Sequence, residues 1–123
     1  MTTVVIDASA LLAFVQGEEG SDTVEEALLA GARCGAANWS EVAQKVRAAG
    51  RDWDLVLALL LSYPTSIEPV VVDDAEWAAQ RWRAGEGLSL ADRLCLALAE
   101  RMDAAVLTAD RSWGASEGVR QIR

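Results

Sequence analysis

The feature that most restricts the fold of this chain is an alternation of short, strand-like apolar runs with longer helix-like segments. Thr3–Ile6, which is β-branched throughout, and Ala105–Thr108 are the clearest predicted strands. Weaker runs at Cys34–Ala37, Val70–Val72 and Val119–Ile122 predict three more. Strands that alternate with helices form parallel sheets with helices on both faces. The pattern therefore predicts an α/β fold with a mainly parallel central sheet.

Helices are expected between these strands, because the intervening segments carry helix start and stop signals. The predicted elements are helices at Ala8–Gln16, Thr23–Ala30, Asn38–Ala49, Asp52–Leu61, Asp73–Ala84 and Ser89–Met102, with a loop between Pro64 and Pro69. Thr23 with Glu26, and Ser89 with Asp92, have the spacing of a capping box. In that motif a side chain and an acid three residues later each bind the other's backbone N–H.

Length and composition are those of one globular unit. With 123 residues, of which 52% are hydrophobic, the chain is expected to form a single domain over residues 1–123. The most apolar run, Leu55–Leu61, is far shorter than the ~20 residues of a membrane span, and the N-terminus is unlike a signal peptide. We therefore expect a soluble, cytoplasmic protein without membrane contact. Cys34 and Cys95 both lie in apolar surroundings and are expected to be buried thiols rather than a disulfide.

Charge and the absence of histidine exclude several functions. The net charge of −8 argues against broad, non-specific binding of nucleic acid, although a bound cation changes the sign of the local field. A chain without histidine has no Ser-His-Asp triad, no histidine general base and no histidine-ligated zinc. The glycine-rich motifs that bind nucleotide phosphates are also missing from the sequence.

Four acids stand at the edges of apolar segments, and these candidate ligands are Asp7, Glu41, Asp92 and Asp110. Each also has a structural explanation: Asp7 as a helix N-cap, Asp110 as a turn residue, and Glu41 and Asp92 as capping-box acids. Capping and ligation are compatible, because the positive end of a helix dipole favours an ionised carboxylate. Sites in parallel α/β sheets also form outside the carboxyl ends of the strands.

The candidate ligands predict the kind of metal. Carboxylates without imidazole or thiolate partners favour hard ions such as Mg²⁺ or Mn²⁺ over Zn²⁺. Crowded acids raise one another's pKa unless a cation is bound. Arg93 and Arg111 follow two of the acids and are candidates for contact with a phosphate, the alternative being surface ion pairs.

Four short motifs, in order along the chain, resemble those of a known family. They are Asp7-Ala-Ser-Ala-Leu11, Asn38-Trp-Ser-Glu-Val42, Leu88-Ser-Leu-Ala-Asp92 and Thr108-Ala-Asp-Arg-Ser-Trp113. Each is similar to one of the acidic motifs of PIN domains. Length, order and spacing together resemble the VapC toxins of bacterial toxin–antitoxin systems, and the resemblance covers nearly the whole chain.

The resemblance implies a three-layer α/β/α sandwich with Mg²⁺- or Mn²⁺-dependent endoribonuclease activity. It implies hydrolysis of tRNA, rRNA or mRNA, which inhibits translation and growth. Matched by motif, Asp7, Glu41, Asp92 and Asp110 are the catalytic and metal-binding acids, and Ser9 and Thr108 are the supporting hydroxyls. A cognate VapB-like antitoxin and a homodimer are implied as well.

Two other functions are compatible with the same residues. A structure-specific DNA nuclease shares the fold, but those relatives usually carry more acids and large basic insertions. A non-catalytic metal-binding interaction module would use the acids mainly as caps. A receiver-type phosphotransfer domain needs a lysine near its acids, and the only lysine, Lys45, is predicted to lie inside a helix.

Overall fold

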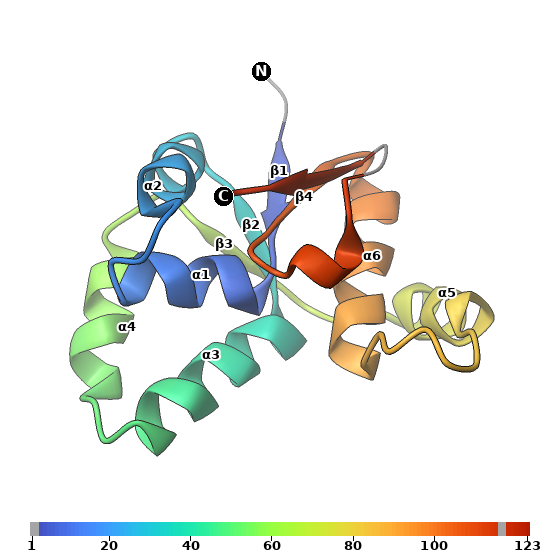
Figure 1. Ribbon diagram of the computed structural model, residues 1–123, viewed down its shortest axis with the longest axis horizontal. Coiled ribbons are helices and arrows are strands. Elements are labelled where there is room, and N and C mark those ends of the chain that lie inside the picture. Colours follow the sequence, from blue (N-terminus) through green and yellow to red (C-terminus); the bar gives the residue numbers. More distant parts are fainter. Residues whose placement is uncertain (1–2, 116–117) are drawn as a thin grey trace.

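A computed structural model describes residues 3–115 and 118–123 of the chain. The strands in these residues form one five-stranded sheet of order β3-β2-β1-β4-β5, in which all four neighbouring pairs are parallel (Figure 1). The strands are β1 (Val4–Ile6), β2 (Arg33–Gly35), β3 (Ser66–Glu68), β4 (Ala105–Thr108) and β5 (Val119–Gln121). The prediction of an α/β fold is confirmed.

Six α-helices and one 3₁₀ turn connect the strands in the described residues. They are α1 (Ala8–Val15), α2 (Ser21–Leu29), α3 (Ala36–Ala48), α4 (Trp53–Leu61), α5 (Val72–Arg81), α6 (Leu90–Met102) and the 3₁₀ turn η1 (Arg111–Trp113). Within the described ranges, no helix has the length and hydropathy needed to cross a membrane.

The two faces of the sheet support separate cores because side chains alternate along each strand. Ile6 and Leu107 point to one face and belong to a large core that α1, α2, α3 and α4 complete. Val5 and Val106 point to the other face and pack with Cys95, Leu98 and other residues of α6. In Figure 1 the first four helices therefore lie to one side of the strands, and α5 and α6 to the other.

The segment around Pro69 is a correction to the sequence interpretation. Val70–Val72 is not a strand: Val70 and Val71 are exposed coil, and Val72 begins α5. The strand lies earlier, at Ser66–Glu68, within the predicted loop, where Ile67 pairs in register with Cys34. The Asp74 carboxylate accepts a hydrogen bond from the Val71 N–H at 3.1 Å and so favours a helix start there. The β-propensity of the three valines was outweighed by this helix cap and by the pairing of β2 with Ser66–Glu68.

Two more helices, besides α5, begin earlier than predicted. α2 begins at Ser21, after Gly20 with a φ of 93°, and it has no side-chain cap, so the predicted box of Thr23 is wrong. α3 follows β2 without a loop and begins at Ala36, which places Asn38 inside the helix rather than at its cap. The predicted caps Asp52 and Ser89 are confirmed, because Asp52 accepts from the Leu55 N–H and Ser89 forms a capping box with Asp92.

Candidate functional site

Asp7 lies at the carboxyl end of the central strand β1 and is only 3% exposed. As the N-cap of α1, it accepts the Ala10 N–H at Oδ1 over 2.9 Å. The Ser9 hydroxyl donates to the same oxygen at 2.8 Å, and the Thr108 hydroxyl donates to Oδ2 at 2.5 Å. Capping therefore accounts for one of the three donors around this carboxylate, and the hydroxyls supply the other two.

The backbone of the loop after β4 orients these two hydroxyls. The Ala109 N–H donates to Ser9 Oγ at 2.9 Å, and the Asp110 N–H donates to Thr108 Oγ1 at 3.0 Å. A hydroxyl has a single proton. A hydroxyl oxygen that accepts from the backbone keeps that proton free to donate to Asp7. The two hydroxyls expected to support the acids thus join β1 to the end of β4.

Burial decides the protonation behaviour of Asp7. Loss of solvent raises its pKa above 3.8, and this effect outweighs the hydrogen bonds from Thr108, Ala10 and Ser9, which lower it. The charge of Asp92 raises the pKa further. The fold therefore brings Asp7 and Asp92 close enough for their charges to interact.

Asp92 occupies the first turn of α6, with one carboxylate oxygen used for capping. Its Oδ2 accepts the Ser89 N–H at 2.9 Å, and its own N–H donates to Ser89 Oγ at 3.0 Å. Its Oδ1 has no hydrogen-bond donor among the described residues. Asp92 is thus a cap and a candidate ligand at once, with one oxygen for each role.

Glu41 is held by a residue to which the sequence interpretation gave only a capping role. Asn38 is 1% exposed, and its Nδ2 donates to Glu41 Oε1 at 3.3 Å and to the Ala91 carbonyl at 3.4 Å. It therefore links α3 to the start of α6, next to Asp92. Asn38 Oδ1 is buried without a partner in the described part of the chain. The signal for this role was an amide three residues before an acid, which also fits a capping box.

Asp110 is turned toward its own loop. Its Oδ1 accepts the Ser112 N–H at 2.9 Å and the Ser112 hydroxyl at 2.6 Å, which makes it the N-cap of η1. Its backbone is tied to the site, because its N–H binds the same Thr108 hydroxyl that donates to Asp7. The turn role weighed for this residue is therefore present in the structure.

The pKa values of the two cysteines show which acids act on the buried region around them. Both are free and buried, as expected. Burial raises the pKa of Cys34 to about 12, and the charges of Asp7 and Glu41 contribute. Burial raises the pKa of Cys95 as well, with contributions from Asp7, Asp92 and Glu41. Three of the four acids thus interact electrostatically with one buried region, and its thiols stay protonated at neutral pH.

The four candidate ligands do not together form a complete metal site. Across residues 3–115 and 118–123, no three Asp, Glu or Cys side chains form a group that could hold one metal ion. The chemistry of the donors nevertheless fits a hard cation: Asp92 keeps a carboxylate oxygen without a donor, both thiols are protonated, and histidine is absent. The residues present therefore suit Mg²⁺ or Mn²⁺ better than Zn²⁺.

The two candidate arginines differ. Arg93 donates from Nη1 to the Ala78 carbonyl at 2.7 Å and so joins α6 to α5, while its Nε is buried without a partner among the described residues. Arg111, directly after Asp110, is exposed. Arg111 is thus the more exposed of the two.

Comparison with known proteins decides the family. The model of the PIN domain matches residues 4–115. The chain belongs to the PIN-domain family. A comparison with curated protein sequences gave no significant match.

Solved structures similar to this PIN domain include two toxin–antitoxin assemblies. A toxin–antitoxin complex from Klebsiella pneumoniae has a TM-score of 0.78 at 20% identity, covering 98% of each chain. DNA-bound VapBC from Salmonella typhimurium has a TM-score of 0.74 at 13% identity, with 100% of each chain covered. PAE2754 from Pyrobaculum aerophilum has a TM-score of 0.67 at 18% identity, covering 98% of this chain and 90% of that one. At these identities the similarity shows the fold.

Proposed function

We propose that this PIN domain is a Mg²⁺- or Mn²⁺-dependent endoribonuclease that acts in the cytoplasm as the toxin of a toxin–antitoxin pair. The observation that carries the proposal is the buried carboxylate of Asp7, held by two oriented hydroxyls and interacting with the charge of Asp92. Burial of a carboxylate is costly for stability, and the charge of a second acid adds to that cost; such arrangements are concentrated at functional sites. Capping alone requires neither the burial nor the second acid.

The roles of the residues follow from their contacts. Asp7 and Asp92 would be the principal metal ligands, with Glu41 and Asp110 completing the acidic set. When bound, the cation lowers the pKa of a bound water and offsets negative charge on the phosphate. Ser9 and Thr108 hold the Asp7 carboxylate in one orientation. Because water and not the ribose 2′-hydroxyl attacks, the products carry a 5′-phosphate and a 3′-hydroxyl.

The toxin role rests on the structural neighbours and on charge. Two of the similar structures are a toxin–antitoxin complex and VapBC. We propose a VapB-like antitoxin as the partner of this chain, and a homodimer as its assembly. A chain of net charge −8 with a carboxylate-rich site attracts a basic partner segment. The substrates in this proposal are tRNA, rRNA or mRNA.

The test compares Asp92→Asn with a matched control, Asp54→Asn. Both acids lie in the first turn of a helix, but Asp54 is exposed at the start of α4. Cleavage of single-stranded RNA should require Mg²⁺ or Mn²⁺ and stop in EDTA. Loss of a residue that supports a metal ligand lowers activity by up to roughly 100-fold. Because Asp92 is proposed as a ligand itself, Asp92→Asn should lower the rate of RNA cleavage by more than that. Asp54→Asn should cleave like the wild type.

Three results would contradict the proposal: cleavage in EDTA, full activity of a folded Asp92→Asn protein, or DNA cut in preference to RNA. Folding of each variant is checked by urea unfolding. The toxin role has its own readout, because expression of the wild type should arrest bacterial growth and expression of Asp92→Asn should not. If bacteria that express a catalytically active enzyme continued to grow, the toxin role would be refuted but the proposed ribonuclease activity would not.

A further inference from the structure

Strand β5 lies at an edge of the sheet and pairs in parallel with β4. The register places Gln121 opposite Thr108, the residue whose hydroxyl donates to Asp7. Paired residues of neighbouring parallel strands project from the same face of a sheet. The side chain of Gln121 is therefore next to that of Thr108, at the carboxyl end of β4.

The Gln121 amide binds both ends of the η1 turn. Its Nε2 donates to the Asp110 carbonyl and to the Gly114 carbonyl, each at 2.9 Å. An amide nitrogen has two protons, so both are used. Asp110 and Gly114 are the residues that flank η1. One side chain of β5 thus joins the residue before the turn to the residue after it.

Both backbone polar groups of Asp110 are bound by this pair of strand residues. The Asp110 N–H donates to Thr108 Oγ1 at 3.0 Å, and the Asp110 carbonyl accepts from Gln121. The same carbonyl accepts the Trp113 N–H at 3.2 Å, within the turn itself. The backbone on either side of the Asp110 side chain is therefore tied to β4 and to β5, and not only to its own turn.

The Asp110 carboxylate keeps one oxygen for a ligand. Its Oδ1 accepts both donors of Ser112, and its Oδ2 has no hydrogen-bond donor in the described part of the chain. Asp92 shows the same division, with one oxygen bound to the Ser89 N–H and the other without a donor among the described residues. The place of the free Asp110 oxygen therefore depends on the backbone that carries this side chain.

The η1 turn has little burial of its own. Arg111, Ser112 and Gly114 are exposed, and none of the three residues of η1 is buried. Exposed segments with few buried contacts open at low free-energy cost. The bond from Gln121 to the Asp110 carbonyl is partly buried, and the amide oxygen of Gln121 is buried too. Water is thus poorly placed to replace this bond, which makes it a principal restraint on Asp110.

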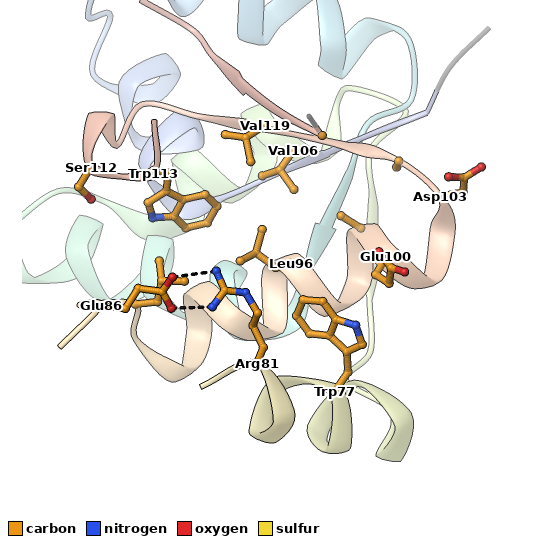
Figure 2. A pocket seen from close by; sticks show the side chains of 14 residues that line it. Trp77, Arg81, Glu86, Leu96, Glu100, Asp103, Val106, Ser112, Trp113 and Val119 are labelled. Atoms are coloured by element: carbon orange, nitrogen blue, oxygen red, sulfur yellow. Dashed lines mark hydrogen bonds and ion pairs between the residues drawn. The ribbon is translucent and has the colours of Figure 1, made fainter. Parts of the chain in front are cut away.

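The Trp113 indole holds the turn in a different way. It packs against the core that contains Val106. Figure 2 shows the indole on the side of β4 and β5 that carries Val106 and Val119, in a hollow of about 530 Å³ that Trp77 lines as well. This packing places the turn as a whole against the sheet, whereas Gln121 fixes the peptide group of Asp110.

We propose that Gln121 is a positioning residue of the metal site, which acts through the backbone of Asp110. The inference rests on the proposed function, because it takes Asp110 as a ligand of Mg²⁺ or Mn²⁺. Loss of a group that orients a metal ligand lowers metal affinity roughly 10- to 100-fold. Gln121 contacts the backbone of Asp110 and not its carboxylate, so its loss should lower the affinity by about 10-fold.

The experiment measures binding of Mn²⁺ to the full-length protein, using electron paramagnetic resonance of the free ion. Gln121→Met keeps nearly the length of glutamine but has no donor, and it should raise the Mn²⁺ dissociation constant about 10-fold. Gln80→Met on the exposed surface of α5 is the matched control and should bind Mn²⁺ like the wild type. In RNA cleavage, Gln121→Met should raise the Mg²⁺ concentration that gives half the maximal rate, and the rate at saturating Mg²⁺ should change much less.

Two comparisons separate positioning from a general loss of stability. If Gln121 acts through Asp110, Gln121→Met should have almost no further effect on Mn²⁺ binding in a protein that already carries Asp110→Asn. Arg101→Ala removes the ion pair to the buried Asp74, at the opposite end of α6 from the acids. It should destabilise the fold without changing the affinity for Mn²⁺.

The possible failures are distinguishable. If Gln121→Met bound Mn²⁺ like the wild type while Asp92→Asn bound it weakly, this inference would be wrong and the proposed function would stand. An equal loss of affinity in Arg101→Ala, or an undiminished effect of Gln121→Met in the Asp110→Asn background, would also refute positioning. A wild type that binds no Mn²⁺ would overturn both proposals. Weaker Mn²⁺ binding by Gln121→Met in a protein that cuts no RNA would refute the ribonuclease and leave the role of Gln121 standing.

Discussion

Thr108→Val tests whether the hydroxyl network supports an ionised Asp7. Valine has nearly the shape of threonine and suits a strand, so β4 should keep its pairing. The change removes one donor to Asp7 Oδ2 and one acceptor for the Asp110 N–H. Thr108→Ser is the matched control, because it keeps the hydroxyl and removes only a buried methyl group.

The magnitude follows from these two bonds. A hydrogen bond to a charged group contributes ~1.5–3 kcal/mol, and an unsatisfied buried N–H costs ~1–3 kcal/mol. The Asp110 N–H is only partly buried, so water offsets some of its loss. We expect Thr108→Val to lower the free energy of unfolding by about 2–4 kcal/mol at pH 7. Thr108→Ser should lower it by about 1 kcal/mol.

The stability cost of Thr108→Val should depend on pH in a definite direction. The pKa of Asp7 in the folded protein is raised above 3.8, so the native state binds its proton more tightly than the unfolded chain does. The contribution of Asp7 to stability is therefore most favourable at acid pH and is lost as the pH rises through its folded pKa. The Thr108 hydroxyl stabilises the ionised form, so its removal raises that pKa further. The cost of Thr108→Val should accordingly shrink as the pH falls toward 3.8.

The assay is urea unfolding of the wild type and both variants from pH 7 downward. The other carboxylates are common to all three proteins, so differences between the curves report on Asp7. A Thr108→Val cost no larger than that of Thr108→Ser, or one that does not change with pH, would refute the argument. RNA cleavage by Thr108→Val should fall as well, because Asp7 loses one of its two side-chain donors.

Three further predictions concern other parts of the fold. Asn38→Ala should lower stability by ~1–3 kcal/mol, because it removes the two hydrogen bonds that the buried Asn38 amide donates, and should reduce RNA cleavage at saturating Mg²⁺. Gly20→Ala should cost about 2–4 kcal/mol, since the residue has a φ of 93° and a Cβ there would lie 2.7 Å from the Ile122 carbonyl oxygen. Arg101→Ala should cost ~1.5–3 kcal/mol, because it leaves the buried Asp74 carboxylate without its ion pair. Urea unfolding measures all three, and changes below about 0.5 kcal/mol would contradict them.

The elements that sequence predicted well are those with strong local signals. β1 and β4 are short apolar strands that stop at or near an acid, and α6 begins at a serine with an acid three residues later. In each case local preference and tertiary structure agree. The positions of Asp7 and Asp92 could be predicted for the same reason, because both stand at such element ends.

The remaining features depend on contacts between distant residues. Whether Ser66–Glu68 or Val70–Val72 forms the strand depends on pairing with β2, about 30 positions earlier, which no local pattern records. The role of Asn38 depends on the Ala91 carbonyl of another helix. The hollow lined by Trp77 and Trp113 is formed by residues of α5, α6, β4 and β5, which meet only in three dimensions. A pattern of acids predicted the candidate site, but not the amide that holds Glu41.

Strand β3, at one edge of the sheet, has a consequence for aggregation. It is three residues long and lies between Pro64 and Pro69, neither of which has a backbone N–H to donate. Another chain could add to this edge over only a few residues before meeting a position without a donor. The exposed apolar stretch Val70–Val72 follows immediately. Pro69 therefore interrupts what would otherwise be a longer, aggregation-prone edge strand that continues from β3 into the three valines.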